Sequence, residues 1–176
     1  MAEFGAEFEA PSHRGAVTMP PEEPRREDPR RAAAAPPPLP FSWPDLSGVH
    51  AFLIEDNEDT RAMVTETLTH CGALVTVFES ADAAIAQLGE LLPTVFICDL
   101  SMPRLNGLEF MRAIRRLPPE RGGNVPAIAI TAYYEDFAAA RALEVGFNAY
   151  MMKPIRLDEL GRAVKELSIS RTARPA

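Results

Sequence analysis

The sequence has few cysteines and no long apolar run, and both shortages restrict what this 176-residue chain does. Cys71 falls late in a predicted helix and Cys98 inside a predicted strand, so we expect two reduced, packed thiols rather than a disulfide. No segment approaches the roughly 18 consecutive apolar residues that a membrane span requires. Glu3, Glu7 and Glu9 interrupt the N-terminus, which is unlike a secretory signal. We therefore expect a cytoplasmic protein without a membrane partner.

Positive charge is also scarce. The formal net charge is −7, which disfavours nucleic acid or an anionic membrane surface as the main partner, so we expect no DNA binding by this chain. Lysine is scarcer still, because only two of the 18 basic residues are lysines. Arginine is therefore the usual basic residue of this sequence, and a lysine at a strand end indicates a specific role for an ammonium group.

Glycine-rich phosphate loops are absent as well. Neither GxxxxGK[ST] nor GxGxxG follows any apolar run, which argues against nucleotide binding. We find no internal repeat.

Proline, in contrast, is abundant near the N-terminus, where residues 1–47 hold ten of the 17 prolines together with mixed runs of charge. We interpret this segment as disordered or polyproline-like, because it has too little apolar surface to offset the entropy lost on ordering. A proline-rich ligand for a partner domain is the alternative. Phe41, Trp43 and Leu46 are candidates for docking onto the folded part. We place that folded domain at residues 48–170 and a polar tail at 171–176.

From Val49 onward, short apolar runs alternate with helical patterns, which predicts a three-layer α/β/α sandwich around a parallel sheet. Met63 is assigned to the buried face of the first helix and Leu91 to that of the second. The predicted strands cover residues 51–54, 74–78, 95–99, 127–131 and 147–152. The predicted helices follow Asn57, Ser80 and Gly107, span residues 135–145, and begin near Asp158.

Polar side chains stand where these strands end. Asp99 closes the central apolar run, and Glu55-Asp56 follows the first strand. Thr131 and Lys153 end the fourth and fifth strands. Because the carboxyl ends of parallel strands meet at one edge of a sheet, we expect these side chains to converge in a shallow cleft.

The chemistry of such a cluster is specific. Adjacent carboxylates repel one another unless a cation neutralises them, and Mg²⁺ suits a site of carboxylates and phosphate oxygens. Asp99 is then placed to act as a nucleophile on a phosphoryl donor. Thr131 offers a hydroxyl donor, and Lys153 offers a positive charge to the added phosphoryl oxygens.

Each residue also has a plainer interpretation. Asp99 alone is equally well a turn residue, and Glu55-Asp56 are acids of the kind favoured at a helix start. Thr131 is a common strand residue, and Asn106-Gly107 is a turn signal. Lys153 is harder to explain in this way, because the chain otherwise uses arginine. The set is far more specific than any one member.

As a set, these residues resemble the receiver domain of bacterial two-component response regulators. The resemblance covers residues 49–168 and rests on four stretches. They are LIEDN (53–57), ICDLSMPRLNGLEF (97–110), AIAITAY (127–133) and YMMKP (150–154). The resemblance implies a flavodoxin-like, doubly wound sheet of five parallel strands in the order 2-1-3-4-5.

The resemblance also implies a metal site and an acceptor. Asp99 corresponds to the phospho-acceptor, and Glu55 and Asp56 to the acidic pair that holds Mg²⁺ together with Asp99. The backbone carbonyl of Ser101 completes the protein ligands of the ion. Glu55 departs from the family pattern, in which the pair is more commonly Asp-Asp.

Further roles follow from the same resemblance. Thr131 corresponds to the switch hydroxyl, Tyr150 to the switch aromatic residue, and Lys153-Pro154 to a pair whose peptide bond is commonly cis. Ser101 and Tyr133 occupy the two variable positions that tune hydrolysis of the acyl phosphate, and the tyrosine predicts a long-lived phosphoryl group.

The function that the resemblance implies is a phosphorylation-activated signalling switch rather than a conventional enzyme. Its phosphoryl donor is a histidine kinase or a histidine phosphotransfer protein, and its downstream protein partner is unknown. We expect either a stand-alone receiver or one from a longer hybrid kinase. A pseudo-receiver, which binds partners without phosphorylation, is the alternative. An aspartate-nucleophile phosphohydrolase is disfavoured because Ser101 stands where that class carries a second carboxylate, and flavin binding lacks a hydroxyl-rich phosphate loop.

Overall fold

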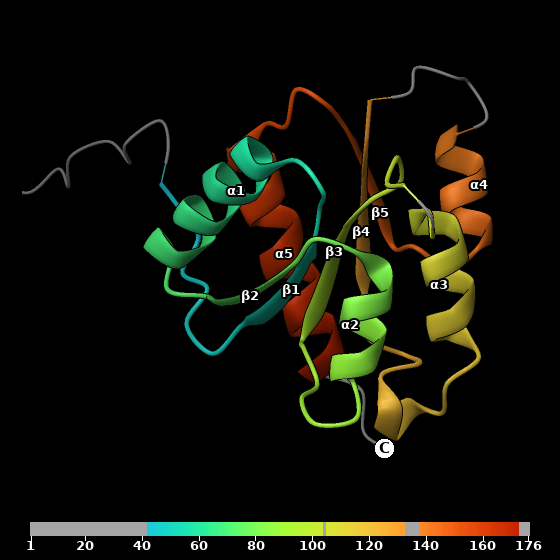
Figure 1. Cartoon of the computed structure of the whole chain (residues 1–176). Coiled ribbons are helices and arrows are strands. Elements are labelled where there is room, and N and C mark those ends of the chain that lie inside the picture. The colour runs from blue at the N-terminus through green and yellow to red at the C-terminus, as the bar shows by residue number, and fades with distance from the viewer. Residues whose placement is uncertain (1–41, 104, 133–137, 173–176) are drawn as a thin grey trace, which may run out of the picture. The chain divides into compact units, whose positions relative to one another are not determined.

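A five-stranded parallel sheet organises the folded part of the chain (Figure 1). The computed structural model describes residues 42–103, 105–132 and 138–172, which belong to one compact unit. The strand order β2-β1-β3-β4-β5 confirms the prediction. The strands are β1 (His50–Ile54), β2 (Leu74–Phe78), β3 (Val95–Asp99), β4 (Ala127–Thr131) and β5 (Ala149–Met152).

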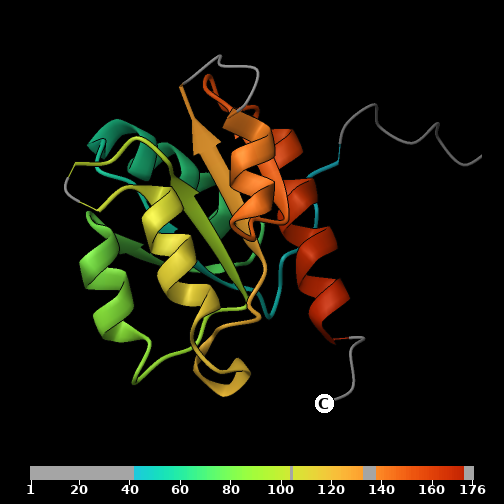
Figure 2. The same cartoon turned by 90° about the vertical axis from the view of Figure 1, so that its right-hand side faces the viewer.

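Helices cover both faces of this sheet, as Figures 1 and 2 show. One apolar core lies between the sheet and the helices α2, α3 and α4, and a second lies between the sheet and α1 and α5. The three-layer prediction is therefore confirmed. The helices are α1 (Glu58–His70), α2 (Ala81–Gln87), α3 (Gly107–Arg115), α4 (Ala138–Glu144) and α5 (Leu157–Thr172), with a 3₁₀ helix, η2, at Pro119–Arg121.

Alternation along the strands supplies both cores. In β1, Phe52 and Ile54 enter the core under α2 and α3, whereas Ala51 and Leu53 enter the core under α1 and α5. Every residue of β3 and β4 is buried. The edge strand β2 differs, since Leu74 is 63% exposed. Because helices cover both faces of β3 and β4, these central strands consist of continuous apolar runs.

Two predicted core positions are wrong. Met63 is 38% exposed, because Val64 and Leu68 carry the buried face of α1. Leu91 is 40% exposed, because α2 ends at Gln87 and residue 91 lies in the loop that leads to β3. In both cases the helical spacing was compatible with burial, and the neighbouring elements determined which positions are covered.

The fifth strand begins two residues later than predicted. Gly146 has φ +109°, and its N–H donates to the carbonyl of Leu143, while Phe147 N–H donates to the carbonyl of Ala142. These two bonds form a Schellman cap on α4, so Phe147 belongs to the helix end and not to the strand. The part of the predicted helix before residue 138 lies outside the described residues.

The segment before β1 is docked on the folded unit. Leu46, one of the three docking candidates, is fully buried, and its N–H donates to the carbonyl of Cys71. Trp43 remains 42% exposed. The prediction of disorder covered residues 1–47, of which 1–41, Phe41 among them, lie outside the described residues, whereas the buried Leu46 does not fit disorder. At the other end, α5 continues through Thr172, two residues into the segment assigned to a polar tail.

Candidate functional site

Four strand ends deliver polar side chains to one edge of the sheet. Glu55 and Asp56 follow β1, Asp99 is the last residue of β3, and Lys153 follows β5. The structure brings these four together, as the sequence predicted. Thr131, the last residue of β4, is buried at the same edge, and its backbone carbonyl accepts a hydrogen bond from Lys153 N–H at 2.7 Å.

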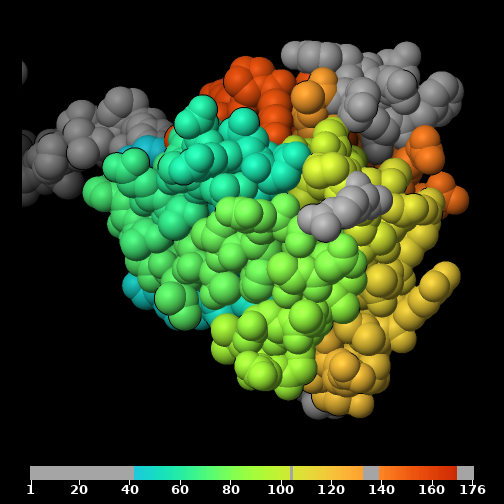
Figure 3. All heavy atoms as spheres, viewed as in Figure 1, coloured from blue at the N-terminus to red at the C-terminus, as the bar shows by residue number. Residues whose placement is uncertain are grey.

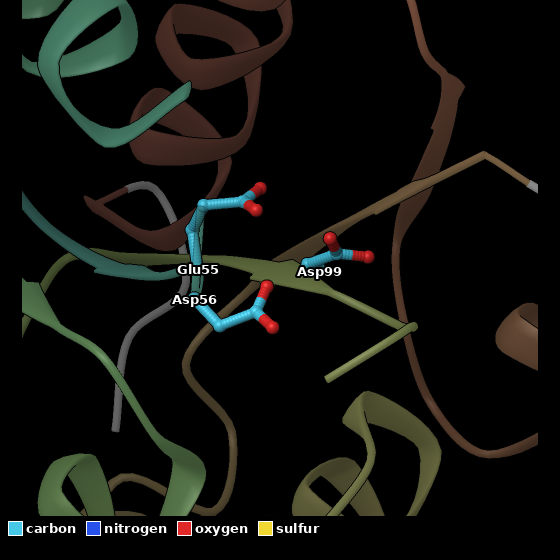
Figure 4. Close-up of side chains that lie close together, drawn as sticks. All are labelled: Glu55, Asp56 and Asp99. Carbon is cyan, nitrogen blue, oxygen red and sulfur yellow. The ribbon is translucent and has the colours of Figure 1, made fainter. Parts of the chain in front are cut away.

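The centre of the site is a group of three carboxylates (Figure 4). One carboxylate oxygen from each of Glu55, Asp56 and Asp99 lies within 4.8 Å of the others. Glu55 is fully buried and Asp99 is 3% exposed, whereas Asp56 faces solvent. The carboxylates of Glu55 and Asp99 are therefore shielded from water, and the carboxylate of Asp56 lies at the solvent-exposed side of the cluster.

Lys153 partly neutralises this charge. Its Nζ lies 2.6 Å from Asp99 Oδ2 and 3.0 Å from Glu55 Oε1. Burial lowers the pKa of Lys153, but hydrogen bonds to Asp99 and Glu55 outweigh this effect and raise the pKa above its usual value. The lysine is therefore a firmly protonated counter-ion, and one ammonium faces three carboxylates.

For Glu55, burial favours the neutral form of the carboxyl group. Burial raises its pKa, the hydrogen bond from Lys153 lowers it, and the negative charge of Asp99 raises it again, with a net rise. Its Oε2 is buried and makes no hydrogen bond, although Lys153 Nζ lies 2.9 Å away as an ion-pair partner. A buried carboxylate oxygen with an unused acceptor position is what a hard cation needs, so these residues fit a divalent metal ion.

Backbone donors and helix caps hold the carboxylates in place. The N–H of Ser101 donates to Asp99 Oδ1 at 2.8 Å, and the N–H of Asn57 donates to Glu55 Oε1 at 3.2 Å. Asn57 also caps α1 by accepting from Thr60 N–H at 2.8 Å. The first turn of α1 is therefore tied directly to the acidic pair.

The β3–α3 loop depends on a close backbone approach. A Cβ atom at Gly107 would stand 2.5 Å from the carbonyl oxygen of Asp99 and 2.9 Å from Leu100 Cα. Asn106 and Glu109 form a reciprocal capping box at the start of α3. The Asn106-Gly107 pair is thus a helix start packed against the Asp99 backbone, and the Asn-x-x-Glu spacing was the sequence signal for the cap.

Arg61 is a contributor that the sequence interpretation missed. Its Nη1 donates to the backbone carbonyls of Glu55 at 3.0 Å and Asp56 at 2.7 Å, and its Nη2 pairs with Glu79 at 3.1 Å. The guanidinium therefore ties the backbone under the acidic pair to the end of β2. No local sequence pattern predicts this role, because the partners are the backbone carbonyls of Glu55 and Asp56, which reach Arg61 only in the folded chain.

The remaining predicted positions lie around this cluster. The Lys153–Pro154 peptide bond is cis, as the resemblance implied. Tyr150 in β5 is half-buried against the core under α2, α3 and α4, and burial raises its pKa. Ser101 is exposed beside Asp99. Tyr133 lies outside the described residues.

Comparison with known proteins decides the family. The model of the response regulator receiver domain matches residues 51–165. The chain belongs to the response regulator receiver domain family. Receiver domains of two-component systems act in general as switches driven by phosphorylation.

Relatives of this receiver domain come from several bacteria. It is 35% identical over 125 residues to the "Uncharacterized 14.6 kDa protein in sodA1 3'region" of Leptolyngbya boryana, covering 71% of this chain and 94% of that protein. It is 30% identical over 111 residues to the Regulator of RpoS of Escherichia coli, covering 63% of this chain but 32% of that protein. The receiver domain thus spans about a third of the length of the latter relative.

A solved structure bears on the acidic cluster. The receiver domain of the sensor histidine kinase PA1611 from Pseudomonas aeruginosa is 28% identical, with a TM-score of 0.63, and the match covers 69% of this chain and 98% of that one. That structure carries a magnesium ion coordinated in its active-site cleft.

Within the described residues of the present receiver domain, no helix is both long and apolar enough to cross a membrane.

Proposed function

We propose that Asp99 accepts a phosphoryl group from the phosphohistidine of a histidine kinase or a histidine phosphotransfer protein. The observation that carries the proposal is the restraint on its carboxylate, with Oδ1 bound by Ser101 N–H and Oδ2 by Lys153 Nζ. A carboxylate oxygen of Asp99 attacks phosphorus and forms the new O–P bond. The P–N bond breaks, and the imidazole nitrogen of the donor keeps the electron pair.

The carboxylates of Glu55, Asp56 and Asp99 and the backbone carbonyl of Ser101 are the groups that would hold Mg²⁺. When bound, the ion offsets the negative charge of the carboxylates and the incoming phosphoryl oxygens. The fit is supported by the unused acceptor position on buried Glu55 Oε2 and by the oxygen-only donor set.

The neighbouring residues then respond to the new charge. Lys153 leaves part of its contact with the carboxylates and pairs with a phosphoryl oxygen, and the hydroxyl of Thr131 donates to another. Tyr150 and α4 repack in consequence, which changes the surface that a downstream protein contacts. Tyr150 is suited to this role because it is only half-buried next to β4.

This chemistry serves signalling, so we propose a cytoplasmic switch and not a conventional enzyme. Within the described residues the chain contains the receiver fold alone, and no DNA-binding element accompanies it. Its partners are therefore proteins: the phosphoryl donor and an effector that distinguishes the two states.

Intact-protein mass measured after incubation with Mg²⁺ and acetyl phosphate tests the proposal. We expect wild type to gain one phosphoryl group and the Asp99→Asn variant to gain none. Far-UV circular dichroism of both proteins verifies that they are folded. If folded wild type gains nothing from acetyl phosphate or from a panel of phosphorylated histidine phosphotransfer proteins, the acceptor role of Asp99 is wrong and the chain is a pseudo-receiver.

A further inference from the structure

The arginines of the folded unit fall into two groups. Arg61 of α1, Arg162 of α5 and Arg156, which directly precedes α5, each form ion pairs with Asp or Glu. A second group forms no ion pair with any carboxylate of the described residues. Its members are Arg112 and Arg115 of α3, the C-cap residue Arg116, Arg121 of η2 and Arg141 of α4. The described residues of α3 with its C-cap, η2 and α4 carry these five arginines against three glutamates, Glu109, Glu120 and Glu144, so this face has an excess of positive charge.

A pocket lies within this basic face. It has a volume of about 370 Å³ between the C-terminal ends of α3 and α4, which Figure 2 shows side by side in yellow and orange. We call it the arginine pocket. Its lining residues are Arg112, Arg115, Arg116, Glu144 and Val145. In Figure 3 the segment from α3 to η2 (yellow to gold) forms part of the exposed surface.

Arg115 forms the rigid part of the pocket. Its Nε and Nη2 donate to the carbonyl of Gly146 at 3.0 and 2.7 Å, and its Nη1 donates to the carbonyls of Gly123 and Val125 at 2.9 and 2.8 Å. The guanidinium also donates to Asn148 Oδ1 at 3.4 Å, so its five bonds join the end of α3 to the loop just after α4, to the loop before β4 and to the residue before β5. Arg112 and Arg116 remain exposed beside it, with no intramolecular partner among the described side chains.

Helix electrostatics explains only part of this pattern. Cations are favoured in the last turn of a helix, so one arginine near the end of α3 needs no further reason. Two exposed arginines flanking a pocket, with Arg121 shortly after them, repel one another and gain little from the same dipole. This arrangement is favourable when an anionic partner supplies the missing charge.

We propose that the arginine pocket is a docking site for an acidic segment of a partner protein. A carboxylate-bearing peptide suits a small pocket whose wall also carries Glu144, since only a short stretch of negative charge can be placed between the arginines. A nucleic acid would extend beyond the pocket onto the surface of a protein of net charge −7. The carboxylate cluster lies at the C-terminal ends of the strands, whereas the pocket lies at the C-terminal ends of α3 and α4, and the inference does not rest on phosphorylation.

Titration of the isotope-labelled full chain with a synthetic oligoglutamate peptide tests the proposal by NMR. We expect the amide and arginine Nε shifts to change around the ends of α3 and α4. The double variant Arg112→Glu/Arg116→Glu should weaken binding by about tenfold, the combined effect of two exposed ion pairs. The milder Arg112→Gln/Arg116→Gln protein gives the same comparison if charge reversal disturbs folding.

Two further variants separate a specific pocket from general charge attraction. Glu144→Gln should tighten binding about threefold, because it removes the repelling carboxylate from the wall. Arg162→Glu lowers the net charge by two, as each of the two reversals in the double variant does, but it lies on α5 and should leave the affinity close to that of wild type. Shift changes spread over the whole surface, or equal weakening by Arg162→Glu, would overturn the proposal. Tighter, arginine-dependent binding of a short DNA duplex would also overturn it, in favour of a nucleic-acid site.

Discussion

At the scale of single residues, the site is governed by an imbalance of charge. Lys153 touches Glu55 and Asp99 at the same time, but its single positive charge cannot neutralise both buried carboxylates and Asp56. Burial is the largest cause of the raised pKa of Glu55, and the negative charge of Asp99 adds to the rise. The metal-free protein therefore carries an electrostatic cost that a divalent cation would remove.

Glu55→Gln removes one of these charges. We expect the free energy of unfolding of the metal-free protein to rise by about 1 kcal/mol, because removing the buried charge and its repulsion from Asp99 outweighs the loss of the ionic contact with Lys153. Mg²⁺ should stabilise the variant less than it stabilises wild type. Urea unfolding with and without Mg²⁺ measures both effects, and exposed Glu58→Gln is the matched control. A metal-free variant less stable than wild type would contradict the assigned imbalance.

His50 provides a pH dependence that is separate from the site. Burial lowers its pKa below 6.5, and its Nε2 lies 2.8 Å from Thr76 Oγ1. The folded state therefore binds fewer protons than the unfolded state around pH 6.5, so stability is fully present above that pH and is lost as the pH falls through the folded pKa. In urea titrations at successive pH values, His50→Gln should lose less stability than wild type on acidification. Parallel pH profiles for the two proteins would rule out this linkage.

At the scale of elements, the ends of helices place the chemistry. Asn57 joins the first turn of α1 to Glu55, and the capping box of Asn106 and Glu109 fixes the start of α3 beside Asp99. Gly107 makes the second arrangement possible because it has no side chain. Helix caps therefore do more here than stabilise helices, since they set the geometry of the loops that hold the carboxylates.

Gly107→Ala tests this close approach. Alanine is the better helix former, yet its Cβ would meet the Asp99 carbonyl at 2.5 Å and push the loop away. We expect a loss of about 1–3 kcal/mol in the free energy of unfolding, together with slower phosphorylation by acetyl phosphate. Gly89→Ala is the control, because nothing lies within 4 Å of its Cβ position. Equal stability of the two variants would show that the loop adapts freely.

At the scale of the whole molecule, the folded unit extends beyond the part that matches the family. The match begins at residue 51, but Leu46 is already fully buried and hydrogen-bonded to the end of α1. Lys165 Nζ donates to the carbonyl of Asp45, which ties the same segment to α5. Residues 42–49 therefore contribute to the stability of the domain.

Leu46→Ala measures that contribution. We expect the free energy of unfolding to fall by about 2–4 kcal/mol, as for other leucines deleted from a packed core. The exposed Leu74→Ala on the edge strand should change it by less than about 0.5 kcal/mol. Urea unfolding monitored by circular dichroism compares them. Similar small effects for the two leucines would mean that the N-terminal segment packs only loosely on the domain.

The sequence by itself determined the class of fold and the candidate site. Apolar runs such as 95–98 and 127–130 are strands buried on both faces, and chemistry-bearing residues stand at their carboxyl ends. Since parallel strands share one edge, the convergence of Asp99, Glu55 and Lys153 followed from topology without any knowledge of distances. The reciprocal cap at Asn106 was also within reach, because its spacing is local.

Tertiary structure decided what depends on neighbours that are distant in sequence. Helical spacing cannot tell Met63 from Val64, because burial depends on where the sheet lies under α1. The bonds of Arg61 and Arg115 go to backbone carbonyls, which every residue has and no sequence pattern distinguishes. The sharing of Lys153 between two carboxylates requires distances of about 3 Å that only packing sets. Local patterns therefore specified which groups meet, and long-range contacts specified how they are held.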